Sequence, residues 1–190
     1  YDAANNVIAL KLYGLTDKYE DAWKGNNKEA ILEFDYDAAN GPNHLFDRYY
    51  VPQCDGYDNG STGTPTQEMV ECYESKNGEK IDRSNSSQLA KGALPLKYGM
   101  DPDMKDGQSG IDVVIYRYAD VLLTLAECIN RNEGSPTTEA VGLVNRVRKR
   151  AGLPELDDAQ TASGEAFNEA ILLELSLIHI SEPTRPLYIS

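Results

Sequence analysis

The chain has 190 residues, 41% of them apolar, with 18 lysine or arginine residues against 31 aspartate or glutamate residues. This length suits one domain with its own hydrophobic core, because a domain typically has about 100–200 residues. A net charge of −13 repels phosphate groups, so nucleic acid is not an expected partner. No run approaches the roughly 20 consecutive apolar residues of a membrane-spanning helix. Cys54, Cys72 and Cys128 lack the CxxC spacing of a zinc knuckle and form no even set, so neither a metal site nor a disulfide framework is expected.

The two ends of the chain differ in character. Apolar residues between Ala3 and Leu15 follow a helical spacing, which predicts a helix there. Ser163 can cap another helix, whose amphipathic pattern stops after Glu174. Residues 175–190 resemble the translation of an adapter used in sequencing libraries, and the alternative is a natural helix end with a proline-rich tail. We therefore expect residues 1–174 to form a partial domain and residues 175–190 to be a non-native tail.

A short strand is expected near residue 32. Leu32, Phe34 and Tyr36 alternate with acidic residues, and this period of two is typical of a half-buried strand. The acidic residues are Glu33, Asp35 and Asp37. Three carboxylates on one face can suggest calcium binding or acid–base chemistry, but EF-hand spacing is absent, so a solvated strand face is the preferred interpretation.

Two long polar stretches, 38–64 and 84–110, are predicted to be loops. A loop of this length in a compact domain is either functional or disordered. The first is rich in Tyr, Asp and Asn side chains, which makes it a candidate binding loop. Residues 65–75, between the two stretches, have a helical pattern that Asn77 and Gly78 would close.

The strongest periodicity predicts two helices between Tyr118 and Ala151. The first helix ends at Gly134, and the second begins with Ser135 as the cap and Pro136 in the first helical position. Together they span 34 residues, the length of one tetratricopeptide unit. Small residues could let the helices approach closely; they are Ala126, Ala140 and Ala151. The short link implies an antiparallel hairpin, which needs neighbouring helices to cover its other sides.

Four segments carry a family resemblance. The first is the run from Arg117 to Leu123 with Ala126 and Glu127, and the second contains Asn145, Arg148 and Arg150 to Pro154. The others are Pro65 to Val70, followed by Gly78, and the strand-like Glu29 to Phe34. In this order they resemble the SusD/RagB family of outer-membrane nutrient-binding lipoproteins. The family's lipidated N-terminal cysteine has no match here, and after Glu174 the family's Arg-rich helix does not follow.

The resemblance implies a mainly α-helical, tetratricopeptide-like scaffold with long loops and a short β element. It also implies a non-catalytic protein on the cell surface of Gram-negative bacteria, held in the outer membrane by a lipid anchor that this fragment lacks. Such a protein captures oligosaccharides, sometimes peptides, and delivers them to a SusC-like TonB-dependent transporter. The family's motif residues would then be buried or interhelical polar partners; in this chain they are Arg117, Asp120, Glu127, Asn145 and Arg148. The pairs to check are Asp120 with Arg117 and Arg148 with Glu127.

Under this interpretation tyrosine rings in the loops stack on sugar faces, and nearby carboxylates and amides bind the hydroxyl groups. The candidate ligand-binding residues are Tyr49, Tyr50, Tyr57, Asp58 and Tyr98. The alternative role for each is packing within the loop. No catalytic residue, cofactor or metal is predicted, because GxGxxG, phosphate-loop and HExxH motifs are absent.

The sequence leaves two alternative functions open, a protein-binding adaptor and a glycoside hydrolase. A tetratricopeptide-like adaptor that binds proteins is the first alternative. A glycoside hydrolase is less favoured, because the available acids, Asp35, Asp37, Asp55 and Asp58, fall on a strand face and a loop rather than on opposed rigid elements. With His44 as the one histidine outside the tail, no Ser–His–Asp set is credible.

Overall fold

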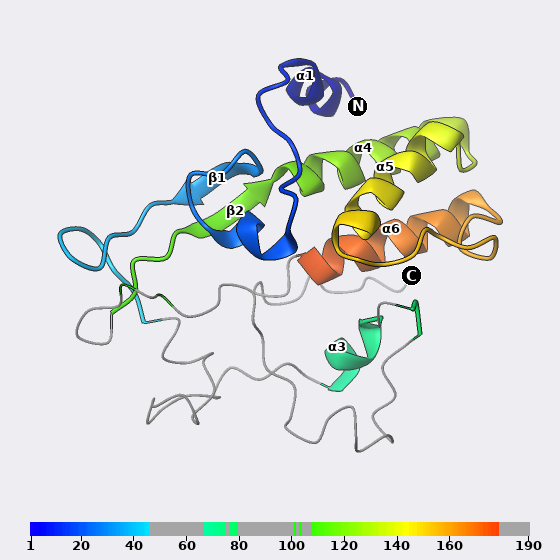
Figure 1. The fold of residues 1–190 in the computed structure, drawn as a ribbon. Coiled ribbons are helices and arrows are strands. Elements are labelled where there is room, and N and C mark those ends of the chain that lie inside the picture. Colours follow the sequence, from blue (N-terminus) through cyan, green and yellow to red (C-terminus); the bar gives the residue numbers. More distant parts are fainter. Residues whose placement is uncertain (46–66, 75–76, 80–100, 102, 104–107, 179–190) are drawn as a thin grey trace, which may run out of the picture.

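The computed structural model describes residues 1–45, 67–74, 77–79, 101, 103 and 108–178. Within these ranges it is mainly helical, with one small sheet (Figure 1). The elements, in chain order, are α1 (Asp2–Ala9), the 3-10 helix η1 (Tyr19–Trp23), β1 (Ala30–Phe34), α3 (Gln67–Cys72), β2 (Val113–Arg117), α4 (Tyr118–Glu133), α5 (Thr138–Arg150) and α6 (Gly164–Ile178). None of the helices in these ranges combines the length and the apolar character that crossing a membrane requires. The expected fold class is confirmed.

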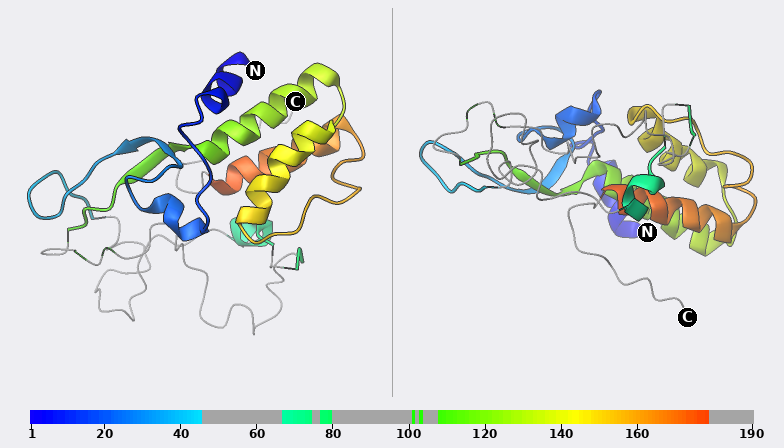
Figure 2. Two further views of the ribbon diagram at one scale, coloured as in Figure 1. Left: turned by 45° about the horizontal axis from the view of Figure 1, so that its top comes forward. Right: turned by 90° about the horizontal axis from the view of Figure 1, so that it is seen from below.

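Helix α4 is the centre of the helical body. Helices α5, α6 and α1 all pack against it, and Figure 2 shows the same arrangement from two further sides. Leu122, Leu123, Val144, Phe167 and Ile171 are fully excluded from solvent in the shared core. The predicted hairpin of α4 and α5 is therefore present, and α1 and α6 cover it.

The ends of the hairpin helices follow from local chemistry. Gly134 adopts a φ of 70° and closes α4, because glycine tolerates this left-handed conformation. The cap of α5 is Thr137, whose hydroxyl accepts a hydrogen bond of 3.1 Å from the Ala140 N–H. The predicted start at Ser135 and Pro136 is thus two residues too early. At the other end Ala151 is exposed rather than packed between helices, because it lies just beyond the last turn of α5.

The first helix is shorter than predicted. Helix α1 ends at Ala9, and Lys11 has a φ of 54°, which no α-helix accommodates. The chain then runs toward the sheet, where the Gly14 N–H donates a hydrogen bond of 2.9 Å to the Lys28 carbonyl. Leu12, assigned to the helix by periodicity, is 69% exposed.

Strands β1 and β2 pair antiparallel, with Leu32 opposite Tyr116. The predicted strand is present, but its apolar side chains are not buried: Leu32, Phe34 and Tyr116 are 51%, 60% and 54% exposed. Two irregularities interrupt the register along β1, and the neighbouring η1 contacts β2. Within β2, Val114 and Arg117 are the buried residues.

Helices α3 and α6 match the remaining predictions in part. Helix α3 lies within the predicted range 65–75 but is shorter, and Gly78 has the expected positive φ of 78°. Helix α6 begins as predicted, with the Ser163 hydroxyl accepting from the Ala166 N–H at 3.1 Å. It continues to Ile178, which is buried against the core, and residues 179–190 lie outside the described residues.

Candidate functional site

A fully buried carboxylate, that of Glu29, joins segments that are far apart in the sequence. Its Oε1 atom lies 2.9 Å from Nη1 of Arg117, and its Oε2 atom contacts Nη1 of Arg150. The same Oε2 atom accepts hydrogen bonds of 2.9 Å from the main-chain N–H and the hydroxyl of Thr16. The Arg117 guanidinium carbon lies 4.2 Å from the centre of the Trp23 ring, a cation–π contact. This network fastens η1 and the start of β1 to the junction of β2 with α4 and to the end of α5.

The network stabilises the fold, and its charged groups are closed to ligands. Burial lowers the pKa of Arg117, and the negative charges of Glu29 and Asp120 oppose that shift by favouring the charged form. Glu29 has no solvent exposure and Arg117 is 1% exposed, so a ligand cannot reach either group without opening the fold.

Arg148 is the centre of a second buried network. Its Nη1 atom lies 2.5 Å from Oε1 of Glu174 on α6, and its Nη2 atom lies 2.7 Å from Oε2 of Glu74, just after α3. Its Nε–H donates to the Pro154 carbonyl at 2.8 Å. Burial alone would lower the pKa of Arg148, but the hydrogen bonds to the two carboxylates raise it above the ordinary value. Burial raises the pKa of Glu174, and Arg148 opposes that shift.

The polar residues implied by the resemblance are scaffold groups, with one correction. Asp120 does lie beside Arg117, but the contact is the Arg117 main-chain N–H, which donates to Asp120 Oδ2 at 2.8 Å and caps α4. The expected pairing of Arg148 with Glu127 is wrong. Glu127 lies 2.6 Å from Arg131, one turn along the exposed side of α4, whereas Arg148 is turned toward α3 and α6.

The five predicted ligand-binding residues, Tyr49, Tyr50, Tyr57, Asp58 and Tyr98, lie outside the described residues. The described residues within the two predicted loop ranges form several hydrogen bonds. His44 and Ser109 exchange main-chain hydrogen bonds of 3.1 and 2.8 Å, and the His44 Nε2 atom lies 2.7 Å from the Ile111 carbonyl oxygen. The Asp101 carboxylate accepts a hydrogen bond of 2.7 Å from the Gly110 N–H. These bonds hold His44 close to Ser109 and Ile111, just before β2.

The acidic residues of β1 are only partly grouped as predicted. Glu33 and Asp35 come together with Asp112, with one carboxylate oxygen from each within 4.8 Å of the others. Asp37 instead accepts hydrogen bonds from the N–H groups of Ala39 and Asn40 in its own turn. Burial raises the pKa of Glu33, and the charges of Asp112 and Asp35 raise it further. Asp112 also accepts a hydrogen bond of 2.8 Å from the Tyr36 N–H, so part of its role is to hold the end of β1.

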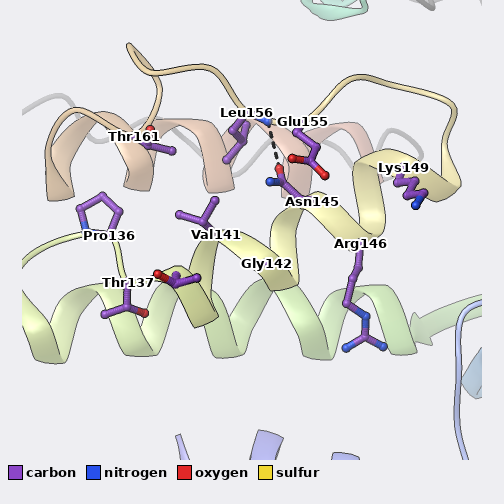
Figure 3. Close-up of a pocket in the computed structure, with 11 residues that line it drawn as sticks. Pro136, Thr137, Val141, Gly142, Asn145, Arg146, Lys149, Glu155, Leu156 and Thr161 are labelled. Atoms are coloured by element: carbon purple, nitrogen blue, oxygen red, sulfur yellow. Dashed lines mark hydrogen bonds between the residues drawn. The ribbon is translucent and has the colours of Figure 1, made fainter.

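A groove of about 690 Å³ runs along α5, on the side formed with the segment that leads to α6 (Figure 3). Pro136 and Thr137 lie at its N-terminal end, and Glu155, Leu156 and Thr161 line the opposite wall. Asn145 holds that wall in place, because its Oδ1 atom accepts a hydrogen bond of 2.9 Å from the Leu156 N–H.

The floor of the groove contains Gly142, in the middle of α5. A side-chain carbon at this position would meet nothing within 4 Å, so no packing constraint requires glycine. Glycine inside a helix costs roughly 0.5–1 kcal/mol relative to alanine. The helix therefore gives up stability at a point where the missing side chain leaves the groove open.

Sequence reasoning missed both the Glu29 network and the groove. Glu29 stands 88 residues from Arg117, and nothing in the local pattern links them. The sequence did contain one signal for the groove, which is Gly142 inside an otherwise regular helical pattern. An isolated glycine in a helix often has a packing or functional reason.

Comparison with known proteins gives a consistent result. A model of the SusD family matches residues 82–177, just over half of the chain. The chain is similar to a SusD superfamily protein from Parabacteroides distasonis, with 23% identity, a TM-score of 0.71, and coverage of 92% of this chain and 42% of that one. It is also similar to a SusD-like carbohydrate-binding protein from Bacteroides fragilis, with 20% identity, a TM-score of 0.71, and coverage of 93% and 44%.

A third similar structure is surface glycan-binding protein A from Bacteroides thetaiotaomicron in complex with laminarihexaose. Its identity is 22%, its TM-score is 0.58, and the match covers 92% of this chain and 49% of that one. The chain thus spans less than half the length of these three structures. Comparison with curated proteins gave no match.

Proposed function

The chain belongs to the SusD family, and we propose that it forms part of a surface protein that captures oligosaccharides and delivers them, chemically unchanged, to a TonB-dependent transporter in the outer membrane. The observation that carries this proposal is the family match over the helical hairpin, joined to a fold shared with proteins whose names include glycan or carbohydrate binding. A lipid anchor outside this chain would hold the protein at the membrane.

The chemistry of the scaffold supports a binding role. The buried carboxylates of Glu29 and Glu174 are neutralised by arginines, and that of Asp120 caps a helix. These contacts give the three carboxylates a role in holding the scaffold together. The His44 ring is likewise bound to a main-chain carbonyl.

The ligand residues of this proposal are Tyr49, Tyr50, Tyr57, Asp58 and Tyr98. Tyrosine combines a flat apolar face with a polar hydroxyl, which suits a sugar ring with one apolar face and many hydroxyl groups. His44 and Asp101, described residues of the same two polar stretches, are held by hydrogen bonds, and a firm support helps side chains to keep one arrangement.

The proposal is tested by affinity electrophoresis of the full chain in gels that contain soluble polysaccharides. We expect Tyr57→Ala to weaken retention severalfold while the helical circular dichroism signal stays the same. Tyr116→Ala is the matched control, because Tyr116 is an exposed tyrosine on β2 that the proposal does not use. Equal retention of the wild type and Tyr57→Ala would remove Tyr57 from the site.

Delivery and the absence of chemistry need separate measurements. A gene for a TonB-dependent transporter beside this one, and co-purification of the two proteins, are expected. Release of reducing sugar from a retained polysaccharide would contradict the non-catalytic role and favour a hydrolase. Binding to proteins without any glycan retention would favour the adaptor.

A further inference from the structure

The groove along α5 is lined by three charged residues, the cations Arg146 and Lys149 and the carboxylate Glu155. The chain carries a net charge of −13, yet two cationic side chains, Arg146 and Lys149, line the C-terminal half of the groove. Among the described residues, neither forms an ion pair, whereas their neighbours Arg148 and Arg150 are both paired and buried. The scaffold therefore uses two of these four cations and leaves the two at the groove free.

We infer that this groove binds an acidic saccharide, with Arg146 and Lys149 taking the carboxylate of a uronic acid unit. This inference rests on the proposed capture of oligosaccharides and names a chemical class of ligand for a site distinct from the predicted tyrosine loops. Hydrogen bonds between a cationic donor and a carboxylate are stronger than neutral ones, so two free cations favour an acidic sugar over a neutral one.

The remaining walls suit the rest of such a ligand. A volume of about 690 Å³ lies within the range of small-molecule sites, roughly 300–1,000 Å³. The Asn145 Oδ1 atom accepts from the Leu156 N–H, and among the described residues no hydrogen bond is formed by its Nδ2 group, which could donate to a sugar hydroxyl. Val141 and Leu156 point toward each other across the middle of the groove and offer an apolar surface beside Gly142 (Figure 3).

Two features of the groove set the conditions for binding. Arg146 extends away from Glu155 in Figure 3, and both cations are exposed and rotatable, so they must turn over the groove to reach one carboxylate. Glu155 lines the opposite wall and repels an anion, while its oxygen atoms can accept hydrogen bonds from sugar hydroxyls. Its removal is therefore expected to strengthen the binding of an acidic sugar.

Isothermal titration of the full chain with tri-galacturonate tests the inference, with laminarihexaose as the neutral comparison. We expect the double variant Arg146→Gln, Lys149→Gln to bind tri-galacturonate about tenfold or more weakly, since each charge-assisted bond contributes on that scale. Gly142→Phe should block the groove and abolish binding, whereas Gly142→Ala should weaken binding less, because its side chain fills less of the groove. Glu155→Gln should bind more tightly than the wild type.

The outcomes separate this inference from the proposed function. Equal affinity of the wild type and the double variant overturns the inference, as does equal competition by poly-glutamate, which would show recognition of charge alone. Binding of laminarihexaose without tri-galacturonate overturns the inference and leaves the proposed function in place. Binding of neither sugar, together with no retention by any polysaccharide, contradicts both.

Discussion

Single residues in this chain have effects that depend on whether their charge is buried. Glu29 neutralises two arginines in a site closed to solvent, whereas Asp17 lies 3.8 Å from Lys28 with its side chain 99% exposed. The two side chains are both carboxylates, but their different burial should give them different contributions to the free energy of unfolding.

Replacement of Glu29 by glutamine should destabilise the fold by about 3–5 kcal/mol, because it removes the carboxylate that is ion-paired with buried Arg117 and Arg150. Urea denaturation followed by circular dichroism measures this loss. Asp17→Asn, the exposed control, should change the free energy of unfolding by less than about 1 kcal/mol. Similar effects for the two variants would show that the network does not hold the fold together.

Glu33 gives a prediction with a defined pH dependence. Burial, with Asp112 and Asp35, raises its pKa above the ordinary value of 4.5, so the folded chain holds this proton more tightly than the unfolded chain. The protonated form of Glu33 therefore stabilises the fold at low pH. This contribution is lost as the pH rises from the pKa of the unfolded chain through the higher pKa of the folded chain.

Glu33→Gln should consequently be more stable than the wild type at neutral pH, by about 0.2–1 kcal/mol for relief of like charges on one strand face. The difference should vanish at about pH 3, where the carboxyl is protonated in both states. Thermal unfolding at the two pH values measures it. A stabilisation that persists unchanged in acid would point to packing rather than charge.

At the scale of elements, Gly134 and Gly142 show the effect of backbone conformation alone, because both have room for a side chain. Gly134 ends α4 with a φ of 70°, and Gly142 lies within α5 in ordinary helical conformation. A side-chain carbon would meet nothing within 4 Å at either position. Any difference between them therefore arises from the backbone.

Gly142→Ala should stabilise the chain by about 0.5–1 kcal/mol, because alanine loses less conformational freedom in a helix. Gly134→Ala should destabilise it by about 1–2 kcal/mol, because an L-residue is strained in the left-handed region. Equilibrium denaturation of both variants tests the pair. Effects of the same sign would contradict the assigned helix boundaries.

The elements also show what the sequence can predict. The α4–α5 hairpin was predictable because its apolar spacing, its glycines and its last-turn cations are local features read along one helix. The exposure of Leu32 and Phe34 was not, because a two-stranded sheet has too few neighbours to make period-two alternation decide which side is buried. The partners of Arg148 were missed for a related reason, since Glu74 stands 74 residues away.

At the scale of the whole molecule, a helical body centred on α4 carries a two-stranded sheet, and His44 and Ser109 pair through main-chain hydrogen bonds. The family and the fold class follow from the motifs, whereas the proposed ligand residues fall in polar stretches with no periodic signal. The groove along α5 adds a second proposed sugar site, and we infer from its two cations that this site favours an acidic sugar.

The most direct test of this account is the electrophoresis of the full chain through gels that each contain one soluble polysaccharide, including laminarin and polygalacturonate, with the polysaccharide recovered afterwards. The account predicts that at least one polysaccharide retards the chain and is recovered with unchanged length. Free migration through every gel, or recovery of shortened polysaccharide, would contradict it.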